Sequence, residues 1–294
     1  MFRRALICTD FNDGLHRLVQ FVPSLKAAGL EHITFLHTLA LPEDREIPRP
    51  DEEREQEIRE RLIGAMAEVP DGMTVEVDVQ SGKPADHIRR AIETHEVEVV
   101  FLGMPSRSRL TERLFGSTTI NLCKRLTVPL LILRPQLIST YTLEELDLRC
   151  QHLFRYLLLP YDESKAARYL IDSIEHYAKA QSESSLTNCL LFRTVDDVSR
   201  KALEEVQGYK LKEAEASLDQ VKPRLEDLGL SVETLVEQGQ GIPQLLHAAM
   251  EYDVTAIALS SDSFGKLIEI SSPSFAGEVL RRSWHPVLYF PPER

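Results

Sequence analysis

Apolar and polar residues follow two patterns along the chain, and both patterns occur in each half. Short runs rich in valine, isoleucine and leucine predict β-strands, and longer amphipathic segments between them predict helices. In the first half, residues 14–28 place apolar side chains at helical spacing, with Pro23 as an expected bend. Residues 57–69 carry a similar apolar stripe. Each half therefore predicts five strands separated by helices.

The two halves also match each other in sequence. Residues 4–13 resemble residues 156–165, and both stretches carry an apolar run that ends near an aspartate, Asp10 or Asp162. Further matching pairs follow in the same order: 32–38 with 187–194, 73–92 with 230–249, 97–106 with 254–263, and 127–133 with 284–290. This order indicates an internal duplication.

The alternation of strands and helices predicts an α/β fold, with a parallel five-stranded sheet in each half and helices on both of its faces. The third strand, 74–79, alternates strictly between apolar and polar residues, which is typical of a sheet edge. The fifth strand, 128–133, is apolar on both faces, and a bare apolar edge would aggregate. We therefore expect the halves to pair through their fifth strands as an internal pseudo-dimer.

We place the first domain at residues 1–140, a linker at 141–151 and the second domain at 152–294. Within the linker, residues 142–150 predict a short helix with Thr142 as its N-cap.

The net charge of −12 argues against a general nucleic-acid binder and against a protein bound to anionic membranes. The apolar runs are too short to span a bilayer, and the first residues lack a secretion signal. The four cysteines form no CxxC pair, and three of them lie in apolar segments. We expect a cytoplasmic protein whose cysteines are mostly buried hydrophobes.

The residues that could bind a ligand follow the first and fourth strands. Ligands of open parallel sheets bind outside the carboxyl ends of strands, where the strand order reverses. Asp10 ends the first strand and Gly103 ends the fourth, so both would face one crevice if those strands are neighbours.

The segment after Gly103 is positively charged, with Arg107, Arg109 and Arg113 against Glu112. Gly116 and the hydroxyl residues after it open the next helix, and a helix N-terminus favours phosphate. The matching segment of the second half is net negative. A bound polyphosphate would therefore suit the first half only.

The whole chain resembles a tandem universal stress protein. Nucleotide-binding members of that family carry a glycine, two residues, a second glycine, nine residues, and then glycine with serine or threonine. Gly103, Ser106 and the pair Gly116 and Ser117 keep this spacing. Ser106 stands where the family has glycine, which would cost on the order of 1 kcal/mol if that position needs a positive φ.

The resemblance implies two tandem doubly wound domains with strand order 3-2-1-4-5 and an ATP site in the first. Asp10 would accept a hydrogen bond from the adenine or ribose side, and the backbone near Thr38 and Leu102 would frame the base. The phosphates would be held along the loop that starts at Gly103 and contains Ser106, Arg107, Gly116, Ser117 and Thr118. Mg²⁺ would accompany ATP without protein ligands of its own.

The second half departs from the family pattern. Its aligned positions are Ser260, Ser263, Pro273 and Ser274, so the glycines are gone, and Pro273 lacks an N–H to donate. Asp162 remains, but an aspartate at a strand end is also a common turn former. We expect a degenerate site there.

Three functions remain open at this stage. The first is an ATP-binding regulatory module of the stress response, with Asp10 as a recognition residue and its protein partner unspecified. The second is a slow ATPase or nucleotidyl transferase; the loop has Glu112 as its only acid, and no histidine pairs with cysteine or carboxylate at ligand spacing. The third is a ligand-free scaffold. In each case a homodimer, in addition to the internal pseudo-dimer, stays open.

Overall fold

A computed structural model describes residues 1–41, 51–104, 126–180, 185–196, 204–262 and 274–292. Its contacts divide the chain into two compact units, Phe2–Leu153 and Phe154–Arg294, with Met1 grouped in the second. The first strand of each unit, β1 (Arg4–Cys8) and β6 (Tyr156–Pro160), is a short apolar run. We call the units the first half and the second half.

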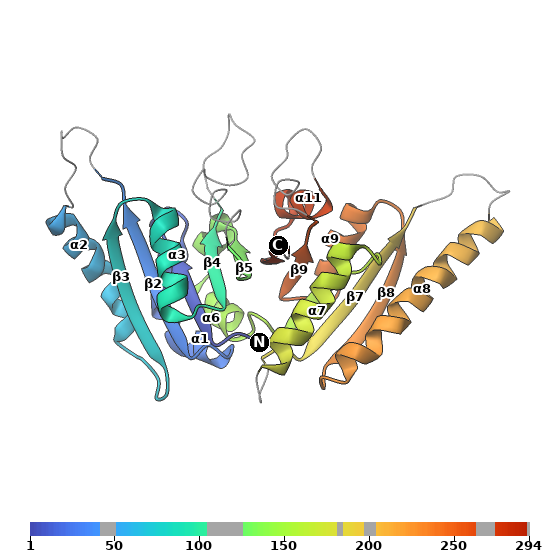
Figure 1. The fold of residues 1–294 in the computed structure, drawn as a ribbon, viewed down its shortest axis with the longest axis horizontal. Helices are drawn as coiled ribbons and strands as arrows, with labels where there is room; N and C mark the ends of the chain where they lie inside the picture. The colour runs from blue at the N-terminus through green and yellow to red at the C-terminus, as the bar shows by residue number, and fades with distance from the viewer. Residues whose placement is uncertain (42–50, 105–125, 181–184, 197–203, 263–273, 293–294) are drawn as a thin grey trace. The chain divides into compact units, whose positions relative to one another are not determined.

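The first half is a parallel sheet with strand order β3-β2-β1-β4-β5 (Figure 1). Its further strands are β2 (His32–Leu39), β3 (Thr74–Ser81), β4 (Val99–Gly103) and β5 (Leu130–Leu133). Its helices are η1 (Leu15–Gln20), α1 (Val22–Ala27), α2 (Glu52–Leu62), η2 (Ile63–Met66), α3 (Pro84–His95), α5 (Pro135–Thr140) and α6 (Leu143–Gln151). The strand order expected from the sequence is confirmed.

The second half repeats this order as β8-β7-β6-β9-β10. Its further strands are β7 (Asn188–Val195), β8 (Ser231–Gln238), β9 (Ala256–Ser260) and β10 (Val287–Phe290). Its helices are α7 (Lys165–Lys179), α8 (Glu204–Glu226), α9 (Gly241–Glu251) and α11 (Phe275–Arg282). The pairing of β5 with its counterpart β10 stays a prediction.

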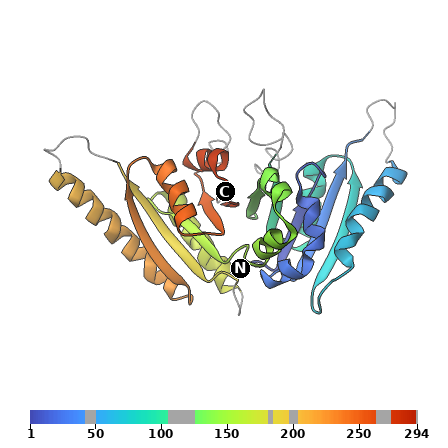
Figure 2. The ribbon, with the colours of Figure 1, turned by 180° about the vertical axis from the view of Figure 1, so that it is seen from behind.

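Helices cover both faces of each sheet. In the first half α3 lies in front of the strands in Figure 1, whereas α1 lies in front in Figure 2. In the second half α7 is in front in Figure 1 and α9 in Figure 2. Right-handed crossovers between parallel strands produce this arrangement, because a crossover that moves left and one that moves right place their helices on opposite faces.

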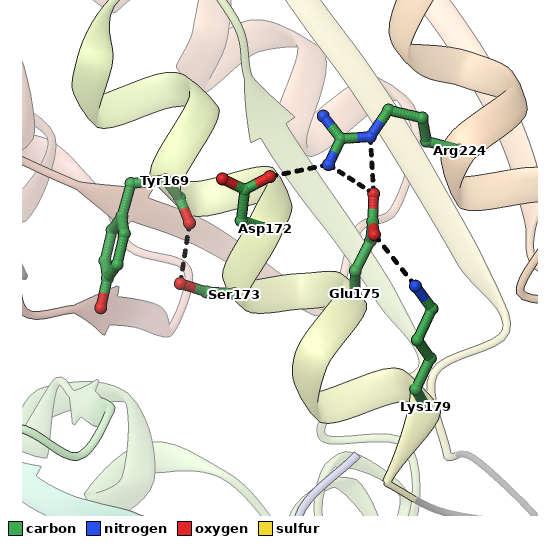
Figure 3. A network of polar contacts seen from close by, with 6 residues as sticks. All are labelled: Tyr169, Asp172, Ser173, Glu175, Lys179 and Arg224. Carbon is green, nitrogen blue, oxygen red and sulfur yellow. Dashed lines mark hydrogen bonds and ion pairs between the residues drawn. The ribbon is translucent and has the colours of Figure 1, made fainter.

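Helix α7 is tied to α8 by a surface network of ion pairs (Figure 3). Arg224 lies 2.7 Å from Asp172 Oδ1 and 2.6 Å from Glu175 Oε1, and Lys179 lies 3.1 Å from the other oxygen of Glu175. The two carboxylates raise the pKa of Arg224, chiefly through the hydrogen bond to Asp172. The network therefore fixes the spacing of the two helices on one face of the second sheet.

The two outermost strands of the first sheet, β3 and β5, follow the sequence pattern. β3 lies at an edge and mixes buried with half-buried residues, while every residue of β5 is buried. The helix expected over residues 14–28, with a bend at Pro23, is instead two pieces, because Phe21 leaves helical geometry (φ −118°, ψ 26°) and Pro23 lies in the first turn of α1. Proline is tolerated in a first turn because its missing N–H has no helical partner there.

The segment assigned to a linker contains α6, which packs against α1 in the first half. Thr142 caps it as expected: its side chain accepts from the Glu145 backbone, and the Glu145 side chain accepts from the Thr142 backbone. Cys150, on α6, and Cys189, on β7, are free and buried, and burial raises the pKa of each thiol to about 12. Among the described residues, no helix is both long and apolar enough to cross a membrane.

Candidate functional site

The carboxyl ends of β1 and β4 lie side by side at the point where the strand order reverses. Ile7 of β1 pairs with Phe101 of β4, so Asp10 and Gly103 follow at the same edge of the sheet. Leu102 is buried and pairs with Ile132 of β5. The structure thus places Asp10, Leu102 and Gly103 around the switch point, as the sequence predicts for a ligand crevice.

The other expected site residues divide into two groups. Thr38 is half-buried near the end of β2, on the far side of β1 from β4. Ser106, Arg107, Gly116, Ser117 and Thr118 lie outside the described residues. Their role in holding phosphate stays a prediction.

Asp10 shapes its own loop. Its Oδ1 accepts hydrogen bonds from the backbone N–H of Asn12 (2.8 Å) and of Asp13 (3.0 Å), and the residue is exposed. In the second half Asp162 accepts in the same way from the backbone N–H of Ser164 at 3.0 Å. Aspartates that accept from the backbone two or three residues onward stabilise turns, so both residues are turn formers in this structure.

Asp13 is the buried acid of the crevice, and the sequence reasoning missed it. Its Oδ1 accepts from the Thr9 hydroxyl (2.8 Å) and the Leu15 backbone N–H (2.9 Å), and its Oδ2 accepts from the Asp10 backbone N–H (3.3 Å). Burial raises the pKa of Asp13 to about 6, against these hydrogen bonds, which lower it. The nearby charge of Asp10 raises the pKa further.

Gly103 lies directly against Asp13. A Cβ on Gly103 would stand 2.4 Å from the Asp13 Cβ, far inside any real contact. The glycine at the end of β4 is therefore required by the turn after β1. The sequence around Asp13 does not predict this contact, because the two residues are ninety positions apart.

Phe11 brings two histidines and an arginine together beside Asp10. Its ring centroid lies 5.3 Å from that of His16 and 5.1 Å from that of His37, and the Arg61 guanidinium lies 3.7 Å from it. Burial lowers the pKa of both histidines, and Arg61 lowers them further. The Nδ1 atoms of His16 and His37 are buried without a hydrogen-bond partner among the described residues. His37 is buried, whereas Phe11 and His16 are half-buried, so these two rings offer surface beside the Asp10 loop.

The second half has an open cavity of about 470 Å³ at the corresponding edge of its sheet. Its charged lining residues are Asp162, Arg193, Asp196 and Asp262, which leaves the lining net negative. Such a surface repels a polyphosphate.

Ser274 of the second half caps α11 with its own side chain. Its Oγ accepts from the Gly277 backbone N–H at 3.2 Å, so one of the free donors of that helix end is already used. Ser260, aligned with Gly103, donates its hydroxyl to the Phe290 carbonyl at 3.0 Å. Both serines therefore serve the fold of the second half.

The family model described as the universal stress protein family matches residues 1–134 and 154–291. This chain belongs to the universal stress protein family. The two matches correspond to the two halves, so the chain carries the family's domain in tandem.

Known relatives agree with this assignment. Universal stress protein MJ0577 of Methanocaldococcus jannaschii is 25% identical over 158 residues, which is 46% of this chain and 96% of the relative. A universal stress protein structure from Archaeoglobus fulgidus covers 98% of both chains at 21% identity, with a TM-score of 0.62. A structure described as a putative universal stress protein from Pseudomonas aeruginosa covers 99% of this chain and 94% of its own, at 12% identity and a TM-score of 0.56. The last two likenesses show the tandem fold.

Proposed function

We propose that this universal stress protein binds ATP with Mg²⁺ at the switch point of its first half and that occupancy by the nucleotide regulates its interactions in a stress response. The second half completes the fold without a nucleotide. The protein acts as a binding module, and Asp10 and its loop serve recognition.

The proposal rests on a difference between the two halves at the carboxyl ends of their strands. In the first half Gly103 packs on Asp13 and begins a segment with three arginines and the Gly116–Ser117 pair. In the second half the corresponding cavity is lined by acids, and Ser274 occupies the helix end with its own hydroxyl. A polyphosphate gains from positive charge and free backbone donors. The sequence of the first half supplies the positive charge, whereas the described part of the second half is acidic and uses one helix donor on Ser274.

The adenine specificity rests on the family pattern, and the aromatic and imidazole surface beside Asp10 supports it. The half-buried rings of Phe11 and His16 offer flat surface beside the Asp10 loop, and the buried His37, next to Thr38 where the base is expected, packs on the Phe11 ring. Flat rings suit a heteroaromatic base, because they can pack on its faces.

The test is the melting temperature of the full chain with and without Mg²⁺–ATP. At about a hundred times its dissociation constant, ATP should stabilise the protein by roughly 2.7 kcal/mol. Gly116→Pro removes a backbone N–H at the expected phosphate loop and should abolish this shift. Ser274→Ala, at the position of the second half aligned with Ser117, removes a helix cap and should lower the melting temperature itself but leave the ATP shift unchanged.

Three outcomes contradict the proposal in different ways. No shift with wild type would favour a ligand-free scaffold. A shift abolished by Ser274→Ala and retained by Gly116→Pro would place the nucleotide in the second half. Steady phosphate release that Gly116→Pro abolishes would make the protein a slow ATPase.

A further inference from the structure

Two histidines and a glutamate lie close together near the amino ends of the strands of the first sheet, away from the switch point at the carboxyl ends. His32 is the first residue of β2, Glu76 lies in β3, and His95 is the last residue of α3. One ligand atom from each lies within 4.8 Å of the other two. The Nε2 of His32 is 3.7 Å from one oxygen of Glu76, and the Nδ1 of His95 is 3.5 Å from the other.

The fold holds these three side chains in place. His32 pairs with Thr74 and Thr34 pairs with Glu76, and alternate residues of a strand share a face, so His32 and Glu76 point to the same side of the sheet. The last turn of α3 covers that side and sets the His95 ring 5.5 Å from the His32 ring. His32 is buried, while the Glu76 side chain is 45% exposed and leaves a path for an ion.

Two imidazoles and one carboxylate are a common ligand set for zinc, with a water molecule in the fourth position. Metal–ligand bonds of about 2.0–2.1 Å in a tetrahedron hold neighbouring ligand atoms roughly 3.3 Å apart. Each nitrogen lies within a few tenths of an ångström of this distance from a different oxygen of Glu76, and with a single oxygen as ligand the three atoms still lie within 4.8 Å of one another. We propose that His32, Glu76 and His95 bind a divalent transition-metal ion of the Zn²⁺ class.

Two side chains beside the three ligand residues bear on metal binding. Arg4 is held by a hydrogen bond from its Nε to the His95 carbonyl at 2.5 Å, and its charge opposes a cation in part. The Thr34 hydroxyl lies 3.3 Å from His32 Nε2 and is the contact that the ion would replace.

The second half provides an internal comparison. Asn188 and Glu233 take the places of His32 and Glu76 in the strand register. Tyr252 takes the place of His95, because each precedes a residue with φ 49°, Asp253 or Glu96. There the carboxylate of Glu233 accepts a hydrogen bond from the Tyr156 hydroxyl at 2.9 Å. The carboxylate is thus common to both halves, whereas the two nitrogen ligands occur in the first half only.

The experiment titrates the full-length protein, without nucleotide, with Zn²⁺ by calorimetry and with Co²⁺ by visible absorption. We expect one ion per chain and a Co²⁺ spectrum of nitrogen and oxygen ligands, without a thiolate charge-transfer band. His95→Asn should weaken binding by about tenfold or more, since even residues that only support metal ligands cost about 10–100-fold. Because no nucleotide is present, the result is independent of the proposed ATP site.

The matched control is His247→Asn, since His247 forms an exposed pair with Glu251 at 3.8 Å in α9. This variant should bind Zn²⁺ as wild type does. Glu76→Gln, at a half-exposed position, gives a second test should His95→Asn unfold the protein, and it should weaken binding to a similar degree. Undiminished binding by the Glu76 variant, a thiolate band with Co²⁺, or no binding by wild type would each overturn the proposal.

Discussion

At the scale of single residues, the crevice depends on one contact that forces a residue choice. Asp13 folds back over the end of β4, and its Cβ leaves no room for a side chain on residue 103. The sequence identified Gly103 through its place in a spaced motif, whereas the structure supplies a reason for it that is independent of any ligand. The sequence does not predict that Asp13 is buried, because its burial depends on neighbouring strands that the local sequence pattern does not reveal.

Gly103→Ala should therefore destabilise the protein. A Cβ at 2.4 Å from another Cβ must displace the β1 turn, and overpacking of this kind costs roughly 1–3 kcal/mol. Gly208→Ala is the matched control, because nothing lies within 4 Å of that position and it is inside α8, where alanine should gain roughly 0.5–1 kcal/mol. Denaturant unfolding of both variants measures the difference. Equal effects of the two changes would contradict the contact.

Asp13 should also give the protein a distinct pH dependence. Its folded pKa is raised from 3.8 to about 6, so the folded state binds the proton more tightly than the unfolded chain. The stabilisation is complete below pH about 4 and is lost as the pH rises through about 6, on the order of 2–3 kcal/mol. Asp13→Asn should remove this loss, so the difference in unfolding free energy between wild type and variant should change across that window. Asp10→Asn removes one of the charges that raise the Asp13 pKa, so it should move this loss of stability to a lower pH without abolishing it.

At the scale of elements, local rules predicted the type of most segments and tertiary packing adjusted their ends. The capping box at Thr142 starts α6 as its sequence indicates. By contrast, the apolar stripe over residues 14–28 suggests one helix, yet the chain turns at Phe21 and begins again at Val22. Periodicity reports which residues face the core, and both pieces satisfy that pattern, so it cannot detect the break.

The α7–α8 network gives an element-scale prediction. Arg224→Ala removes two ion pairs and should lower the unfolding free energy by about 1 kcal/mol, since Arg224 and Asp172 are exposed to solvent whereas Glu175 is mostly buried. Lys179→Ala removes only the exposed pair at (i, i+4) and should cost about 0.5 kcal/mol or less. Urea unfolding, repeated at high salt, measures both. A larger effect for Lys179→Ala would contradict the ranking.

At the scale of the whole molecule, the duplication is the feature that organises structure and proposed function. Both halves have the same strand order, and each buries its own core. They differ at both ends of the strands. At the carboxyl ends the first half has Gly103 and the second has Ser260. At the amino ends the first half has the histidine pair and the second has tyrosines. We infer that the halves share a scaffold and that the proposed ligand chemistry belongs to the first half alone.

Separate fragments test the predicted pairing of the halves. Phe2–Leu153 and Phe154–Arg294 are distinct units, so each should unfold cooperatively when expressed alone. The apolar fifth strands predict that each fragment self-associates and that the two form a one-to-one complex when mixed. Analytical ultracentrifugation measures both. Fragments that stay monomeric alone and in the mixture would contradict pairing through β5 and β10.

The sequence by itself determined the duplication, the succession of strands and helices, the edge character of β3 and the family. These are properties of neighbouring residues or of order along the chain, which pattern reports directly. Only the tertiary structure decided that Asp13 is buried against Gly103 and that His32, Glu76 and His95 share one corner. Those groups come from strands and helices far apart in sequence, and strand order, register and helix placement bring them together. The spacing of these residues along the chain therefore does not predict that they come together.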